Sequence, residues 1–330
     1  MITDIINYYR QNKKLLVWKN IVLLIGFHPI GFVGLIRVLI GAVKLNTIIF
    51  DYVIGLLGFL SLSAGAHRLW SHRSYKARWP LRLMLVCFNF LLYENPIIHW
   101  ARDHRTHHKF SDTDADPHDP RRGLFFAHLG WAMLKKKPEV LEKGKTIDQS
   151  DLNDDPVLKW QEKYYMVFMP LGTFILPTVI PMYYWNETFV NAYCVNILRY
   201  LICLHMHGLI NSVAHYYGDR PYDRLIRPTD GLTVCALTLG EGLHNFHHTF
   251  PWDYRCAELG TFAFNTTKHF IELCAKIGWA YDLKITSEEV IRKRIARTGD
   301  KTHLWGWGDK DQTAEEFRGT IIVNSDKKID

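Results

Sequence analysis

Four long apolar segments divide an otherwise polar chain, and they cover residues 21–39, 48–66, 166–185 and 189–210. Each is close to the roughly 20 residues that a helix needs to cross a bilayer. The only charged residues within them are Arg37, Asp51 and Arg199. A fifth apolar segment, residues 83–93, is too short to span and is expected to be buried or interfacial. The pattern predicts an all-α, polytopic membrane protein with four transmembrane helices in two hairpins; the alternative is a soluble protein with buried helices.

Basic residues ahead of the first apolar segment predict its orientation. Four of them lie there: Arg10, Lys13, Lys14 and Lys19. The positive-inside rule places such a flank in the cytosol. The turn at residues 186–188 has no Lys or Arg, as a non-cytosolic turn should, whereas Lys44 in the first turn disagrees. With four crossings both termini are cytosolic, and residues 67–165 and 211–330 form a cytosolic helical cap within a single domain, residues 1–330.

Histidines gather in three clusters at the ends of the apolar segments or in the polar stretches between them. The clusters are HRLWSH (67–72), HRTHH (104–108) and HNFHH (244–248), and a fourth element is NSVAH (211–215). Together they offer nine imidazoles and one amide, which are too many for one metal ion and suit two. A site made almost wholly of imidazole favours iron, zinc, copper or nickel over calcium or magnesium.

The spacing within each cluster indicates how its side chains converge. Positions i, i+3 and i+4 lie on one face of a helix, so the second and third clusters each present three imidazoles together. Two histidines five residues apart, as in the first cluster, converge only if the helix ends near Ser71. The ten candidate metal ligands are His67, His72, His104, His107, His108, Asn211, His215, His244, His247 and His248. The other eight histidines are expected to have core, capping or surface roles.

The charge and the cysteine content indicate the redox state of the thiols and the kinds of partner that the protein can bind. The chain carries a formal net charge of +7 and six cysteines. None of the cysteines forms a CxxC pair, so reduced thiols are expected rather than a disulfide framework. Lys135, Lys136 and Lys137, with Arg121 and Arg122 upstream, offer cations for ligand phosphates or anionic lipid headgroups. Nucleic acid is a poor partner for a polytopic membrane protein without a basic aromatic motif.

The histidine clusters lie in longer motifs that resemble a known family. The segments AGAHRLWSHR (64–73), WARDHRTHHK (100–109), DADPH (114–118) and GEGLHNFHHTFPWDY (240–254) resemble the histidine boxes of the membrane stearoyl-CoA-type acyl-CoA desaturases. RTGD (297–300) and WGWG (305–308) look like the tail of insect members. The resemblance covers nearly the whole chain.

The resemblance implies an enzyme of the endoplasmic reticulum membrane that introduces a double bond into a fatty acyl-CoA. It implies two iron ions held by the nine histidines, with Asn211 holding a water, and O2 as co-substrate. Electrons would come from cytochrome b5 and NADH-cytochrome b5 reductase, and a basic cap suits an acidic donor. Three carboxylates near the motifs are candidates to orient imidazoles, with ordinary salt bridging as the alternative: Asp103, Asp230 and Glu241.

The same resemblance assigns substrate contacts. Six residues are assigned: Lys135 and Lys136 near coenzyme A, Gly55 and Phe59 at the floor of the acyl tunnel, and Trp100 and Gly208 beside the chain. The sequence departs from the family where Gly208, after His207, replaces a common tryptophan, and where Glu94 replaces a glutamine. These departures leave both Δ9 chemistry and an altered regioselectivity such as Δ11 open.

Other functions remain as alternatives. Fatty-acid or sterol hydroxylases and conjugases share histidine-rich membrane sites of this class. A histidine-rich metal transporter is a further alternative, but it should place its ligands inside the membrane spans near the midplane. Here the clusters lie at helix ends and in hydrophilic segments, which favours desaturation.

Overall fold

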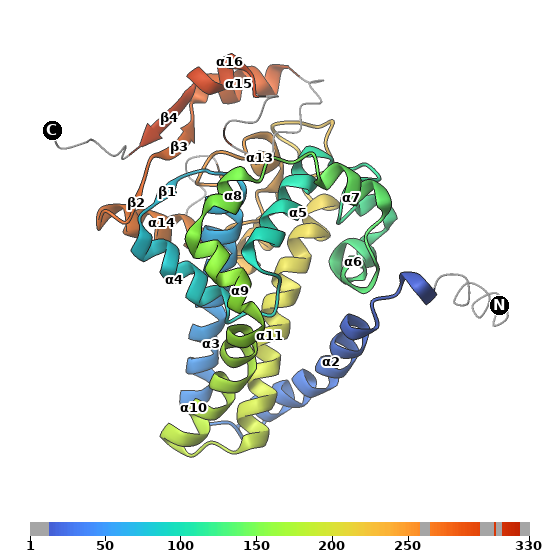
Figure 1. Cartoon of the computed structure of the whole chain (residues 1–330), viewed down its shortest axis with the longest axis vertical. Helices are drawn as coiled ribbons and strands as arrows, with labels where there is room; N and C mark the ends of the chain where they lie inside the picture. The colour runs from blue at the N-terminus through green and yellow to red at the C-terminus, as the bar shows by residue number, and fades with distance from the viewer. Residues whose placement is uncertain (1–12, 258–264, 298–306, 308–311, 324–330) are drawn as a thin grey trace.

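The computed structural model describes residues 13–257, 265–297, 307 and 312–323, and it is mostly helical (Figure 1). Four helical segments are long and apolar enough to cross a membrane: Trp18–Leu39, Leu45–Ser71, Pro156–Trp185 and Phe189–His215. These spans confirm the four predicted apolar helices. Arg10, His303 and most of the two tail motifs lie outside the described residues.

Each span is built from the elements labelled in Figure 1. The first is α2 (Trp18–Leu39), and the second joins α3 (Leu45–Leu60) to a π-helix, η2 (Ser61–Ser71). The third runs through α9 (Pro156–Pro170), η5 (Leu171–Ile175) and α10 (Leu176–Trp185). The fourth is α11 (Phe189–Asn211), followed by η6 (Val213–His215) after Ser212.

The third span begins ten residues before the predicted segment because its start is set by a cap and not by hydropathy. The Asp155 carboxylate accepts the backbone N–H groups of Val157 and Leu158, and Pro156 takes the first helical position. Both features favour the start of a helix. An apolar window therefore finds the membrane part of this helix and misses its polar first turns.

Helix α11 lies at the centre of the spans, and α2, α3 and α10 all pack against it. Two glycines of α2 bring that helix close to α11. A Cβ on Gly34 would lie 2.3 Å from the Cys194 carbonyl oxygen, and one on Gly31 would lie 2.5 Å from a Leu201 methyl group. Small residues at such contacts let helix backbones approach closely in a bilayer. The main neighbour of α2 is therefore α11, although α3 follows α2 in the chain.

We expect Gly34→Val to destabilise the protein because the new side chain overlaps the α11 backbone. Overpacking of this kind costs about 1–3 kcal/mol. Gly26→Val is a matched control on the same helix, since nothing lies within 4 Å of a Cβ at Gly26. Thermal unfolding of both variants in detergent measures the difference. Equal melting temperatures would contradict the packing of α2 on α11.

Residues 72–155 and the described residues after 215, with residues 13–17 beside them, form a second part of the molecule, here called the cap, most of which lies in the upper part of Figure 1. Its longer helices are α4 (Trp79–Asn89), α5 (Ile97–Lys109), α14 (Thr266–Lys276) and α15 (Glu288–Ala296). Its shorter helices are η1 (Lys13–Leu15), η3 (Pro120–Arg122), η4 (Phe126–Gly130), α6 (Trp131–Met133), α7 (Pro138–Gly144), α8 (Ser150–Asp154), α12 (Leu232–Leu237), α13 (His244–Thr249) and α16 (Ala314–Arg318).

Four short strands in the described residues add to this mostly helical fold, and the all-α prediction did not include them. β1 (Lys76–Ala77) pairs antiparallel with β2 (Ala280–Tyr281), and β3 (Leu283–Thr286) pairs antiparallel with β4 (Thr320–Val323). Strands of two to four residues are too short to show an alternating pattern in the sequence. Their partners are also distant along the chain, so only the folded cap brings them together.

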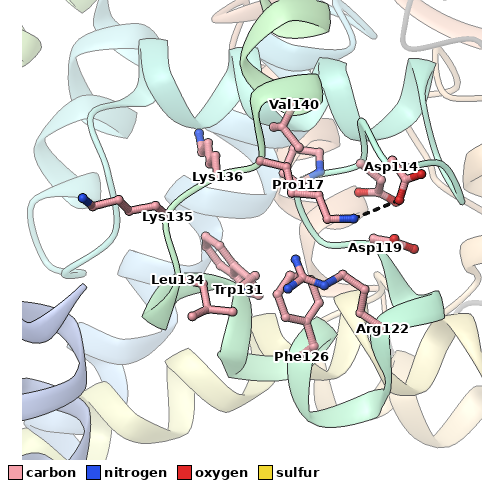
Figure 2. A pocket seen from close by; sticks show the side chains of 12 residues that line it. Asp114, Pro117, Asp119, Arg122, Phe126, Trp131, Leu134, Lys135, Lys136 and Val140 are labelled. Carbon is pink, nitrogen blue, oxygen red and sulfur yellow. Dashed lines mark hydrogen bonds and ion pairs between the residues drawn. The ribbon is translucent and has the colours of Figure 1, made fainter. Parts of the chain in front are cut away.

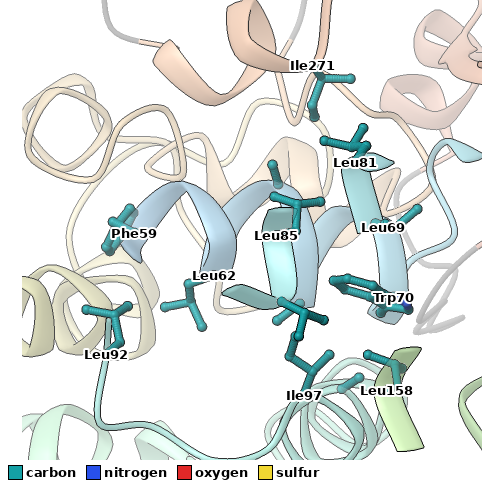
Figure 3. Packing of buried hydrophobic residues seen from close by; sticks show 14 of the residues in the cluster. Phe59, Leu62, Leu69, Trp70, Leu81, Leu85, Leu92, Ile97, Leu158 and Ile271 are labelled. Atoms are coloured by element: carbon teal, nitrogen blue, oxygen red, sulfur yellow. The ribbon is translucent and has the colours of Figure 1, made fainter. Parts of the chain in front are cut away.

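The largest hydrophobic cluster surrounds η2 and joins the spans to the cap (Figure 3). All eleven residues of η2 are buried. Leu81 and Leu85 of α4 and Ile97 of α5 are fully buried against it. The segment at residues 83–93, expected to be buried or interfacial, lies mostly in α4. This packing holds the end of η2 in a fixed position, where the first histidine cluster lies.

Candidate metal centre

The structure brings together the nine histidines predicted as metal ligands, in two buried groups. The first group is His67, His72, His104, His108 and His247. The second group is His107, His215, His244 and His248. Within each group, one ring nitrogen of every residue lies within 4.8 Å of the others. The predicted convergence of the clusters is therefore present, and it forms two centres of nitrogen donors.

The π-helix explains how two histidines five residues apart face the same centre. The His72 backbone N–H donates to the His67 carbonyl at 3.1 Å, which is the five-residue hydrogen bond of a π-helix. This wider winding places residues five apart on one face, and the ring centroids of His67 and His72 are 4.9 Å apart. The helix also ends at Ser71, as the spacing required.

Helix α5 and helix α13 each divide their histidines between the two groups. His104 and His108 of α5 belong to the first group, and His107 belongs to the second. In α13, His247 belongs to the first group, and His244 and His248 belong to the second. The i, i+3, i+4 spacing therefore serves two neighbouring centres rather than three ligands of one ion.

The separations of the ring nitrogens fit two metal ions. Five Nε2–Nε2 distances are short: His72–His104 2.8 Å, His67–His247 2.9 Å, His244–His248 3.0 Å, His108–His247 3.1 Å and His215–His244 3.1 Å. Two imidazole nitrogens that bind one ion at about 2.1 Å and at right angles lie about 3.0 Å apart. Within each of the two groups, the donor nitrogens are thus spaced as ligands of one ion.

Protonation states support the same interpretation. Burial, and then the neighbouring imidazoles, hold the pKa of His104, His108, His244, His247 and His248 well below the usual value. Neutral imidazoles have a lone pair for a metal. The Nε2 atom of His107 is buried and has no hydrogen-bond partner in the described part of the chain. Asn211, which ends α11, is also buried, and its Nδ2 has no described partner.

Asp116 orients His107 from the outside of the second group. The His107 Nδ1–H donates to the Asp116 carboxylate at 2.8 Å, and both side chains are buried. Burial lowers the pKa of His107, but Asp116, with smaller contributions from Asp112 and Asp119, more than offsets burial, so the pKa is raised. With the proton held on Nδ1, Nε2 is directed to the group. Asp116 lies in the DADPH motif (114–118), and its spacing from His107 did not indicate that the two side chains would be hydrogen-bonded.

Glu241 orients His67 in the first group, as predicted. Its carboxylate lies 3.2 Å from His67 Nδ1 and 2.7 Å from the fully buried Arg68 guanidinium, and it accepts a hydrogen bond from Ser63. Burial raises the pKa of Glu241, but Arg68, His67 and Ser63 together hold the pKa below its usual range. The carboxylate therefore stays ionised and fixes the His67 ring.

The other two carboxylates predicted to orient imidazoles have different described contacts. Asp230 accepts the backbone N–H groups of Asn245 and Phe246 at 2.8 and 3.2 Å, so it caps the first turn of α13. Asp103 pairs with Arg102 and Lys136. Cys256 was not among the predicted site residues, and its sulfur lies 3.4 Å from His247 Nδ1. That contact joins residues nine apart across a turn, which no helical spacing would suggest.

We expect Asp116→Ala to lower metal content and turnover by about 10–100-fold, because loss of an outer hydrogen-bond partner typically has that effect. Asp116→Asn should retain more of both, since its amide oxygen still accepts the His107 proton. Asp114→Ala is the matched control, because Asp114 is exposed and pairs only with Lys137 and Arg121 among the described residues. Metal analysis of the purified variants tests this, and equal metal content in all three would contradict the role of Asp116.

Five of the six predicted substrate residues lie at three separate places. Lys135 and Lys136 line a groove of about 750 Å³ between α2 and the cap. They also line the neighbouring pocket drawn in Figure 2, which shows their ammonium groups directed apart. Gly55 and Phe59 line a cavity of about 310 Å³ between α3 and α11. Trp100 stacks on His104 with ring centroids 4.8 Å apart, which places it directly against the first group.

Gly208 lies beside the imidazole of His128, a residue of η4. A Cβ at this position would lie 2.8–3.0 Å from the His128 imidazole, and Gly208 lines neither the groove nor the cavity. The His128 ring therefore fills the space beside this residue. The predicted place of Gly208 beside the acyl chain stays a prediction, and no spacing in the sequence indicated the contact with His128.

Comparison with known proteins agrees with the motifs. A family model described as fatty acid desaturase matches residues 43–264. The chain is 48% identical to an acyl-CoA Delta-9 desaturase of Acheta domesticus over 312 residues, which cover 94% of this chain and 87% of that protein. It is 47% identical to an acyl-CoA Delta(11) desaturase of Spodoptera littoralis over 310 residues, or 94% and 91% of the two chains.

A third relative has a different printed activity. The chain is 46% identical to a (11Z)-hexadec-11-enoyl-CoA conjugase of Bombyx mori over 291 residues, which cover 88% of each chain. The family match covers both histidine groups, and the relatives extend over most of the chain. The chain therefore belongs to the fatty acid desaturase family and is an oxidoreductase of the membrane-bound, histidine-rich kind.

Proposed function

We propose that this protein is an acyl-CoA desaturase that uses O2 and two iron ions to introduce a double bond into a fatty acyl-CoA. The observation that carries the proposal is the pair of buried histidine groups, with donor nitrogens 2.8–3.1 Å apart. Removal of two hydrogens from an unactivated chain is an oxidation. Zinc has no redox chemistry, so iron is the metal that fits both the ligands and the reaction.

The ten proposed ligands would hold the metals, and their surroundings would keep the ligands in place. The irons and O2 supply the oxidising power when bound, and the protein supplies position and exclusion of water. Glu241 and Asp116 fix two of the imidazoles by hydrogen bonds to Nδ1. Trp100 covers His104, so it forms a wall against which one C–C bond of the acyl chain can be positioned.

The groove and the cavity would hold the two ends of the substrate. Lys135 and Lys136 line the groove that opens to the surface, where cations suit the phosphates of coenzyme A. Gly55 and Phe59 lie on the span that leads to His67, and the cavity that they line is mostly apolar, which suits the methyl end of the acyl chain. The chain would pass the histidine groups between these two places.

The proposed setting is the endoplasmic reticulum membrane, with both termini and the cap in the cytosol. The basic flank of the first span supports this orientation. Electrons would come singly from cytochrome b5 and its NADH-dependent reductase, and the net charge of +7 suits an acidic donor. Relatives with Δ9, Δ11 and Δ12 names are 44–50% identical to this chain, so either Δ9 or Δ11 chemistry is compatible with the comparisons.

Expression in yeast that lacks its own desaturase, with acyl chains of different length supplied in turn, tests the proposal. Gas chromatography–mass spectrometry after derivatisation would locate any new double bond. New monoenes that disappear in His104→Ala would support acyl-CoA desaturation. Hydroxylated products would move the protein to the hydroxylases. No product from membrane-inserted, iron-loaded protein would contradict the proposed function.

A further inference from the structure

A buried carboxylate–imidazole pair lies beside the metal centre and has no part in the mechanism above. Glu94, in the segment before α5, lies 3.2 Å from His207 Nδ1 of α11. The two side chains are only 8% and 7% exposed. Removing such groups from water is costly even when they pair with each other, so a buried carboxylate–imidazole pair indicates a role beyond stability.

The pair lies between the groove and the first histidine group. The His207 ring is 5.8 Å from Trp100, and Trp100 stacks on His104 at 4.8 Å. Glu94 itself lines the groove, together with apolar side chains such as Phe27, Tyr165 and Leu204. An acyl chain that enters by the groove would meet Glu94 on its way toward the histidine groups.

The chemistry of the pair is that of a hydrogen-bonding site. One carboxylate oxygen of Glu94, Oε1, contacts His207, and within the described residues no hydrogen bond is made to Oε2. A hydroxyl group donates one hydrogen bond and accepts others, whereas a plain methylene chain offers nothing to a carboxylate. A plain chain would cover Glu94 Oε2 with methylene groups and leave this oxygen buried without a partner, which is costly, so the site favours a hydroxylated chain over a plain one.

We propose that Glu94 and His207 select a fatty acyl-CoA that carries a hydroxyl group near the carbons to be oxidised. The hydroxyl would donate to Glu94 Oε2, and His207 would hold the carboxylate in place through Oε1. The inference rests on the proposed function, because it names the substrate class of the same acyl channel. It assigns a role to Glu94, one of the two positions at which the sequence departs from the family motif, and to His207, which precedes the other.

A purely structural role predicts different behaviour. In that case the pair only links the segment before α5 to α11, and its loss would lower stability without changing the choice of substrate. Glu94→Leu removes both the hydrogen bond to His207 and the carboxylate oxygen that would accept the hydroxyl. Glu94→Gln keeps a hydrogen bond to His207 and a neutral acceptor, so the two variants separate stability from selectivity.

The experiment compares purified, iron-loaded enzyme with a reducing system on two kinds of probe. One is octadecanoyl-CoA, and the other is a series of monohydroxy-octadecanoyl-CoAs in which the hydroxyl moves along the chain. We expect one position to be preferred, with kcat/KM about ten-fold or more above that of the plain chain, as the partner for a buried hydroxyl implies. In Glu94→Leu and His207→Leu this ratio should fall to about one, mainly through KM, and Glu94→Gln should retain part of it.

Glu162→Leu is the matched control, since Glu162 is a second carboxylate of the groove that pairs with a histidine, His99, but is 41% exposed. Its ratio should equal that of the wild type. If the wild type desaturates the plain chain and prefers no hydroxylated isomer, the inference is wrong and the proposed function stands. A preference that persists in both leucine variants also overturns it. No product from any probe would instead contradict the proposed function.

Discussion

His247→Ala is expected to abolish product formation and to remove metal from the first histidine group. His247 Nε2 lies 2.9 Å from His67 Nε2 and 3.1 Å from His108 Nε2, so it is central to that group. Loss of an outer hydrogen-bond partner already costs about 10–100-fold, and loss of a ligand should cost more. Product analysis in the complemented yeast and iron analysis of the purified variant measure the two effects.

His269→Ala serves as the control, because His269 lies on α14 with a side chain that is 53% exposed. It should leave both product and iron content at the wild-type level. The His247 variant should still insert into membranes, since its side chain contributes donors rather than core packing. Wild-type turnover in His247→Ala would contradict the assignment of a metal to this group.

Glu241→Ala is expected to lower both stability and metal content. The substitution would leave Arg68 buried without its carboxylate partner, because Arg68 is 0% exposed and lies 2.7 Å from Glu241. Breaking one side of a buried ion pair typically costs about 3–5 kcal/mol. The His67 ring would also lose its Nδ1 partner. Thermal unfolding in detergent and iron analysis report the two consequences separately.

Two further variants test the cause of that loss. Glu241→Gln keeps a side chain of the same shape with one carbonyl oxygen, so it should lose less stability than Glu241→Ala. Glu288→Ala removes an exposed ion pair with Arg292 and should change the melting temperature little. Equal stability of Glu241→Ala and Glu288→Ala would show that the buried pair with Arg68 does not hold the site together.

The membrane spans were the most predictable part of the fold because a bilayer imposes a length and a composition that a sequence displays locally. Errors came at the helix ends. The spans continue beyond the apolar segments, to Ser71 in the second and to His215 in the fourth. Polar residues such as Arg68 are buried there by the cap, and hydropathy cannot distinguish a polar residue in water from one paired inside a protein.

The grouping of the candidate metal ligands was predictable for a related reason. Helical periodicity is a local property, so a spacing of three and four residues shows which imidazoles share a face. The number of imidazoles also indicated two metals rather than one. The roles of Asp116 and Cys256 were not predictable from spacing, since each contacts its histidine through a turn rather than along a helix.

By itself the sequence determined the four apolar helices, the identity of the nine histidines and the family that their motifs resemble, because each of these depends on residues that are close together in the sequence. Only the tertiary structure decided how the histidines divide into two groups, since contacts such as His67–His247 join residues 180 apart. It also decided that a π-helix aligns His67 with His72, that Gly208 faces His128, and that Glu94 meets His207. The physical reason is the same in each case: packing between distant segments selects these contacts, and local spacing carries no information about them.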